Sequence, residues 1–193
     1  MTRSACVVYH SGFGHTKKQA EAVFDGLNQV DGVEAQLIPV DKLVDEGSSA
    51  WTQLDSANAI VFGCPTYMGL PSAGLKTFME ATSKRWMEQK WADKLAAGFT
   101  NSGSHNGDKQ NTLVGIASFA AQHGMVWINL NLMPGNNTSA GSVEDLNRLG
   151  SFLGAMSQSN LDEGPDVAPT TADLETARQL GRRVGECAKR WSA

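Results

Sequence analysis

The chain has 193 residues and a mass of 20.6 kDa, with 41% hydrophobic and 19% charged residues. This profile predicts one globular domain spanning 1–193 and excludes an intrinsically disordered chain. The formal net charge of −4 and the pI of about 5.5 argue against nucleic acid and against an anionic membrane surface as partners.

Short apolar runs alternate with amphipathic segments along the chain. In chain order, strands are expected at 5–9, 33–40, 59–63, 94–100 and 125–128. Helices are expected around 20–27, from Leu75 onward, over 112–123 and over 170–191, and 41–55 reads as a connector. An Asn-, Gly- and Ser-rich insertion is expected at 131–150, after which 152–156 resumes the sheet. The alternation predicts an α/β fold, a three-layer doubly wound five-stranded parallel sheet with the insertion in the region of its fifth strand.

The three cysteines lie far apart, and no stretch of the chain has the spacing of a metal site or the length of a membrane span. Cys6, Cys64 and Cys187 form neither a CxxC pair nor a zinc pattern, so reduced thiols and no bound metal are expected. The N-terminus lacks the apolar region of a signal peptide. A cytoplasmic location is the resulting prediction.

Three loops of unusual composition follow expected strands and should meet at one rim of the sheet, where ligands of such folds bind. The first loop precedes a helix, whose N-terminus favours a phosphate. Lys17 occupies the position where a dinucleotide-binding GxGxxG motif needs its third glycine, and Gly12 does not open a Walker A loop. A phosphomonoester held by backbone and hydroxyl groups remains, beside the alternative of an ordinary capped turn. The phosphate-loop candidates are Ser11, Gly12, Phe13, Gly14, His15 and Thr16.

The other two loops suit the ring of a planar ligand and its polar edge or tail. The second, 65–71, is stiffened by prolines and offers flat or polarizable side chains to a ring. Its candidates are Pro65, Thr66, Tyr67, Met68 and Gly69; the alternative is a turn that fills the core. The third is small and polar, with Asn101, Ser102, Gly103, Ser104, His105 and Asn106 as candidates; the alternative is a solvated loop. Together, a phosphate loop, a ring loop and a polar edge describe a site for flavin mononucleotide (FMN).

Four segments carry a resemblance to a known family, and residues of the C-terminal segment 169–181 are also similar. The four segments are Tyr-His-Ser-Gly-Phe-Gly-His-Thr at 9–16, Gly-Cys-Pro-Thr-Tyr-Met-Gly at 63–69, the segment 95–107, and His-Gly-Met-Val at 123–126. On these segments the chain resembles the flavodoxin-like superfamily and, within it, the WrbA-type NAD(P)H:quinone oxidoreductases. The resemblance implies the strand order 2-1-3-4-5 and FMN as the cofactor.

The same resemblance implies roles for individual residues. Residues 11–16 would hold the phosphate, 66–68 would line the ring, and 101–106 would contact the ring edge and the ribityl chain. His123 would reach the pyrimidine side of the ring as a catalytic residue, and Trp86 would cover the substrate site of another subunit. Trp86 and Trp91 are expected to be exposed at an interface or to cover a helix.

The implied activity is a two-electron, ping-pong transfer from NADH or NADPH to a quinone-like acceptor, by a homo-dimer or homo-tetramer. The alternative is a flavodoxin-type electron carrier, for which a net charge of −4 is weak support because carriers commonly dock through a strongly acidic face. A flavin-binding module without turnover is a third hypothesis.

Overall fold

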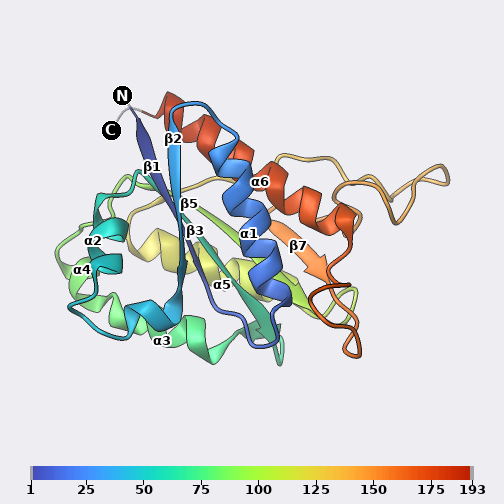
Figure 1. Cartoon of the computed structure of the whole chain (residues 1–193), viewed down its shortest axis with the longest axis horizontal. Helices are drawn as coiled ribbons and strands as arrows, with labels where there is room; N and C mark the ends of the chain where they lie inside the picture. The colour runs from blue at the N-terminus through green and yellow to red at the C-terminus, as the bar shows by residue number, and fades with distance from the viewer. Residues whose placement is uncertain (1, 192–193) are drawn as a thin grey trace.

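The computed structural model describes residues 2–191, which form a parallel sheet between two layers of helices (Figure 1). The strands are β1 (Arg3–Tyr9), β2 (Val33–Pro39), β3 (Ala59–Tyr67), β4 (Leu70–Pro71), β5 (Leu95–Ser102), β6 (Val126–Trp127) and β7 (Ala155–Gln158). The helices are α1 (His15–Asn28), α2 (Ser49–Ser56), α3 (Ala73–Ala81), α4 (Ser83–Met87), α5 (Lys109–Gln122) and α6 (Thr171–Arg190), with a short 3-10 helix η1 (Val40–Leu43).

The strand order is β2-β1-β3-β5-β6, with β7 also paired to β5 and β4 paired to β3. Counted along the chain as the expected strands, this is the order 2-1-3-4-5, so the predicted doubly wound fold is confirmed. All pairs are parallel except β3 with β4. The carboxyl ends of β1, β3, β5 and β7 therefore meet at one edge of the sheet.

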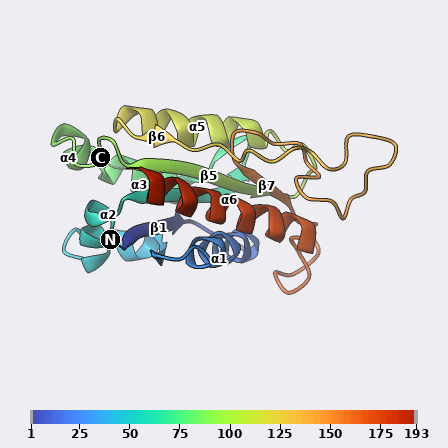
Figure 2. The ribbon, with the colours of Figure 1, turned by 90° about the horizontal axis from the view of Figure 1, so that it is seen from above.

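Successive residues of the central strands face opposite layers, which is why those strands are apolar throughout. Val7 and Val61 pack under α1 and α6, while Val8 and Ile60 pack under α2, α3 and α5. Figure 2 shows α1 and α6 on one side of the sheet and α5 on the other. A Cβ at Gly26 would collide with the carbonyl oxygen of Arg178, so this glycine lets α1 and α6 approach closely.

Two local predictions are corrected. The expected connector 41–55 contains most of η1 and most of α2, a helix that is capped by Ser48 and buries Trp51 and Leu54. The expected loop 65–71 is mostly strand: β3 runs on to Tyr67 and β4 pairs back against it. The turn between them, at Met68 and Gly69, has positive φ at both positions. Short amphipathic helices and hairpins gain their stability from packing, which the local pattern does not reveal.

The predicted insertion at 131–150 lies within a long connection, 128–154, between two short strands that share one neighbour. β6 pairs with the start of β5, at Leu95 and Ala96, and β7 pairs with its end, from Phe99 to Ser102. The returning strand begins at Ala155 rather than at 152. Figures 1 and 2 show part of the connection projecting beyond the rest of the chain.

Asn147 and Arg148 tie this connection to the body of the domain. The Asn147 backbone N–H donates to the Thr176 hydroxyl of α6 at 2.8 Å, and the Arg148 guanidinium pairs with Asp173 of the same helix. Within residues 2–191, no helix has the length and apolar character required to cross a bilayer.

Candidate functional site

A cavity of about 750 Å³ lies at the carboxyl ends of β1, β3, β5 and β7. This volume is in the range of small-molecule and cofactor sites, roughly 300–1,000 Å³. Its walls are residues Gly12, Phe13, His15, Thr16, Pro65, Thr66, Tyr67, Met68, Asn101, Ser102, Gly103, Ser159, Asn160, Leu161, Glu163, Gly164 and Pro165. The structure thus brings all three predicted loops together and adds a fourth segment, 159–165.

The first wall is the loop that leads from β1 into α1. The Ser11 hydroxyl accepts hydrogen bonds from the backbone N–H groups of Gly14 (3.1 Å) and Lys17 (3.2 Å), so Ser11 braces the loop from behind and does not line the cavity. Gly14 has φ 94°, a left-handed conformation that glycine adopts without strain. The loop thereby presents the first turn of α1, with its free N–H groups, to the cavity.

The second wall is the hairpin of β3 and β4. Thr66 is buried, and its hydroxyl lies 2.8 Å from those of Thr100 and Thr112, which anchors the hairpin on β5 and α5. Beyond it, Tyr67 reaches across to Gly12, where a Cβ would meet its hydroxyl oxygen. Met68 stands at the tip of the turn and is 99% exposed.

The third wall is the end of β5 and the residues after it. Asn101 is buried, and its amide donates to the Ser159 hydroxyl at 2.7 Å. Ser102 and Gly103 line the cavity, whereas Ser104, His105 and Asn106 lie outside it on the exposed part of the loop. Of the third predicted loop, only its first half therefore forms the wall.

The fourth wall, 159–165, was absent from the sequence-based candidates. It follows β7 and packs against the loop 11–16. The His15 ring forms a hydrogen bond with the Glu163 carbonyl at 2.8 Å, and Pro165 packs against Gly14. Gln158 connects the fourth wall to the third by donating to the Gly103 carbonyl and to the Asn160 side chain. The available signal was that 159–165 follows the last expected strand, whose carboxyl end reaches the same rim.

Apolar side chains surround the mouth of the cavity. Phe13 and Leu161 are 77% and 92% exposed, and Met68 lies between the same walls. These apolar side chains suit a ring system, the N–H groups in the first turn of α1 suit a phosphate, and the polar side chains on β5 suit the polar edge of the ring. Gly12 and Gly103 let these walls approach one another, because a Cβ would strike the Tyr67 hydroxyl at Gly12 and the Leu161 side chain at Gly103.

The predicted contact of His123 with the ring is not made within the chain itself. α5 begins near the cavity and ends beside β6, which pairs with the first residues of β5, so His123 lies at the opposite end of the sheet. It is 2% exposed, its Nε2 lies 2.9 Å from the Thr82 hydroxyl, and its ring lies 4.7 Å from that of Trp91. Burial lowers the pKa of His123, which favours its neutral form. In its own chain, His123 is a core residue without access to the cavity.

The two tryptophans differ from each other. Trp86 on α4 is 45% exposed and lies outside the cavity of its own chain, so a contact with another subunit stays a prediction. Trp91 is fully buried in an aromatic cluster with Phe62, Phe78 and Phe119. The expectation that Trp91 is exposed is wrong because its ring fills the layer under α5.

The cysteines carry no redox pair. All three are free; Cys6 and Cys64 are buried. Burial raises the pKa of Cys6 to about 12 and that of Cys64 to about 11, so both are protonated thiols at neutral pH.

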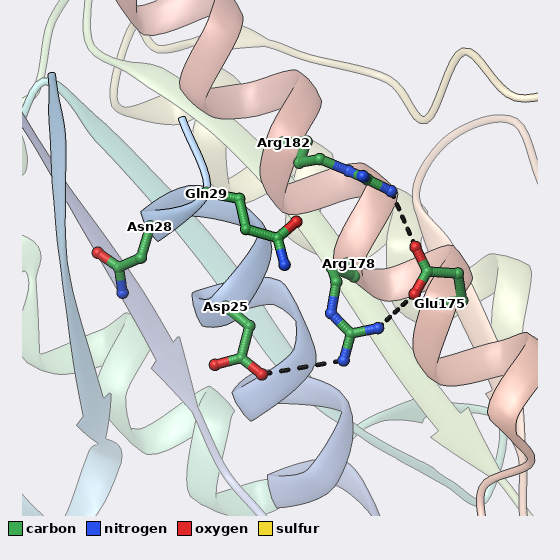
Figure 3. A pocket seen from close by; sticks show the side chains of 6 residues that line it. All are labelled: Asp25, Asn28, Gln29, Glu175, Arg178 and Arg182. Carbon is green, nitrogen blue, oxygen red and sulfur yellow. Dashed lines mark hydrogen bonds and ion pairs between the residues drawn. The ribbon is translucent and has the colours of Figure 1, made fainter. Parts of the chain in front are cut away.

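A second hollow lies between α1 and α6, lined by Asp25, Asn28, Gln29, Glu175, Arg178 and Arg182. Figure 3 shows both arginines directed at the Glu175 carboxylate, with Asp25 across the groove. Its charges pair with one another and it has no apolar wall. It therefore lacks the combination of surfaces that distinguishes the cavity at the sheet edge.

Comparisons with known proteins agree with this geometry. The model of the NADPH-dependent FMN reductase family matches residues 11–137. A protein of Pseudomonas aeruginosa named flavodoxin FldP is 44% identical over 93% of this chain and 94% of its own. An NAD(P)H dehydrogenase (quinone) of Archaeoglobus fulgidus is 30% identical over 95% of this chain and 96% of its own.

Among solved structures, a WrbA-like flavodoxin from Agrobacterium tumefaciens superposes with a TM-score of 0.76 at 38% identity, covering 99% of this chain and 100% of that one. The chain therefore belongs to the NADPH-dependent FMN reductase family and is a flavodoxin-like flavoprotein of the WrbA type.

Proposed function

We propose that this protein binds FMN in the cavity at the sheet edge and transfers electrons from NADH or NADPH to a quinone or a similar acceptor. The observation that carries the proposal is the cavity itself. It joins a helix N-terminus with free N–H groups to an apolar mouth and a polar wall. Bound FMN would supply the hydride chemistry, which belongs to the cofactor.

The chain's own residues would bind and shield the cofactor. The backbone of 12–16 and the first turn of α1 would hold the phosphate. Tyr67 and Met68 would lie against the ring, and Asn101, Ser102 and Gly103 would face its polar edge. Phe13 and Leu161 would exclude water from the mouth.

Relatives named NAD(P)H dehydrogenase (quinone), aligned along nearly the whole chain, support the enzyme. The relative named flavodoxin, at 44% identity, favours a second candidate: an electron carrier that binds FMN without turnover by nicotinamide. For the enzyme we propose a ping-pong cycle, because one open cavity would serve donor and acceptor in turn.

The proposal extends to the setting of the protein. A cytoplasmic location would supply NADH and NADPH and would keep the three free thiols reduced. A homo-dimer or homo-tetramer would cover Trp86 and the neighbouring Met87, which is 74% exposed. Light scattering on the purified protein tests this assembly: a monomer mass contradicts it.

An anaerobic titration tests the activity. The protein is loaded with FMN, NADH or NADPH is added, and the visible flavin band is followed. We expect rapid bleaching, then recovery when benzoquinone is added. A loaded flavin that resists both nucleotides would favour the electron carrier, and failure to retain flavin would overturn the site.

A further inference from the structure

Lys109 is a buried lysine that the proposed function does not use. It is the first residue of α5 and is 0% exposed. Its Nζ donates to the Ser102 hydroxyl at 2.7 Å, the Ser104 carbonyl at 2.7 Å and the His105 carbonyl at 2.9 Å. Among residues 2–191, no carboxylate lies within 4.0 Å of this ammonium group. Lysine is rarely buried without such a partner.

The carboxylate that favours the charged form of Lys109, that of Asp173, already has other partners. Asp173 accepts two hydrogen bonds from the Arg148 guanidinium, at 2.8 and 2.7 Å, and one from the Gln158 backbone N–H at 2.9 Å. Asp173 and Arg148 both act on Lys109 through space, with opposite effects on its charge. Lys109 and Arg148 are cations and Asp173 is an anion, so these three buried side chains carry one excess positive charge. The helix dipole at the N-terminus of α5 adds to the positive potential.

This positive charge lies directly behind a wall of the cavity. Ser102 lines the cavity, and its hydroxyl both accepts from Lys109 and donates to the Ser104 carbonyl. The carbonyls of Ser104 and His105 point at the ammonium group. In a planar trans peptide the C=O and the N–H of the following residue point in opposite directions, so the N–H groups of His105 and Asn106 point away from Lys109. Lys109 therefore fixes the shape of the third wall as well as its potential.

We infer that Lys109 is a positioning residue that holds the third wall of the cavity and compensates the negative charge that reduction adds to FMN. Adding two electrons and one proton to the neutral ring leaves one net negative charge. A fixed cation behind the wall lowers the free energy of that charge more than that of the oxidised ring, and so raises the reduction potential. The inference rests on the proposed binding of FMN, and it concerns the potential rather than the turnover.

The experiment compares Lys109→Met with Lys109→Arg and with a matched control, Lys94→Met. Lys94 is partly buried and likewise donates to backbone carbonyls, those of Asp55 and Ala57, but it precedes β5 at the end of the sheet away from the cavity. For each protein, fluorescence titration gives the FMN dissociation constant, and reduction with dithionite against a reference dye gives the two-electron potential.

We expect K109M to lower the ratio of affinities for reduced and oxidised FMN about tenfold, which equals a fall of about 30 mV for a two-electron couple. K109R keeps the charge and should stay near the wild-type potential, and K94M should not change it. A K109M potential equal to that of the wild type would overturn the inference while leaving FMN binding intact. A wild-type protein that binds no FMN would overturn the proposed function as well.

The pH dependence gives a second test that needs no variant. Burial lowers the pKa of Lys109 to about 8; Asp173 opposes that shift and Arg148 adds to it, while His105 and Asp108 flank the lysine on its own loop. The compensating charge is present below that pKa and disappears above it. The reduction potentials of bound and free FMN are measured between about pH 6 and about pH 10. Above about pH 8, the potential of bound FMN should decrease more steeply with pH than that of free FMN. A profile parallel to that of free FMN would contradict the role of Lys109, whether or not K109M folds.

Discussion

Ser11 illustrates how a residue can shape a binding loop without lining the cavity. Its hydroxyl accepts from two backbone N–H groups and so sets the curvature that delivers the first turn of α1 to the site. The sequence identified the residue, but its side chain lies behind the loop rather than in front of it. A change of charge at this position would still act on a bound phosphate through the short loop.

Ser11→Asp should therefore weaken FMN binding at least tenfold. An aspartate can accept the same two N–H bonds, so the loop is preserved while a negative charge is placed beside the phosphate. Fluorescence titration measures the dissociation constant, and riboflavin, which lacks the phosphate, serves as the control ligand with unchanged affinity. Equal FMN affinity in S11D and the wild type would contradict the proposal that this loop binds the phosphate.

His123 is expected to make stability depend on pH. Its pKa is lowered by burial, so the unfolded chain binds a proton more readily than the folded one as the pH falls through the range of a free histidine. The free energy of unfolding should then be highest above that range and should fall below it. Urea denaturation from about pH 7.5 to about pH 5 measures the slope.

The variant His123→Gln should show a smaller slope, because it removes the buried imidazole that takes up a proton on unfolding. His105→Gln is the matched control, since His105 lies on the exposed part of the third loop, and it should keep the wild-type slope. Identical slopes in the wild type and H123Q would show that His123 does not control the acid response.

At the scale of elements, the sheet edge that carries the cavity is assembled from segments far apart in the sequence. β7 is separated from β6 by the connection 128–154, yet it pairs with the second half of β5. Arg148, at the end of that connection, bonds Asp173 in the first turn of α6, and Asp173 in turn bonds the Gln158 N–H at the end of β7. This buried ion pair therefore joins three elements behind the cavity.

Arg148→Met should lower the free energy of unfolding by about 3–5 kcal/mol, because it leaves the Asp173 carboxylate buried without its cation. Arg178→Met removes the ion pair of Arg178 with Glu175, which is more exposed to solvent. This variant should lower the free energy of unfolding by less than about 1 kcal/mol. Urea denaturation compares the two variants. Equal losses would mean that the Arg148 pair contributes no more than a surface pair.

For the whole molecule, the most visible departure from a compact outline is the projecting part of the connection (Figures 1 and 2). Residues 136–140 are exposed, while a Cβ at Gly141 would already touch the Gly135 carbonyl. The two ends of this stretch thus lie close enough to be joined. The domain core and the cavity use none of its side chains.

Deleting 136–140 should change the free energy of unfolding by less than about 0.5 kcal/mol and should leave the FMN dissociation constant unchanged. Denaturation and fluorescence titration test both statements, and light scattering of the same protein shows whether the projecting segment serves the proposed assembly. A marked loss of stability in the monomeric domain would show that the segment packs on its own chain.

The sequence by itself determined the alternation of strands and helices, the place of the insertion and three of the four cavity walls. Those features depend on local patterns: continuous apolar runs, helical stripes, and glycine or proline after a strand. Thr66, Asn101 and Gly12 could be identified in this way because each follows, or ends, a strand whose carboxyl end must reach the rim.

Only the tertiary structure decided which distant residues meet. The bonds from Asn101 to Ser159 and from His15 to Glu163 join residues 58 and 148 positions apart and create the fourth wall. The length and direction of α5 place His123 at the far end of the sheet, and burial without a carboxylate partner makes Lys109 a charge behind the cavity. Such properties come from what surrounds a side chain after folding, and no local pattern in the sequence encodes them.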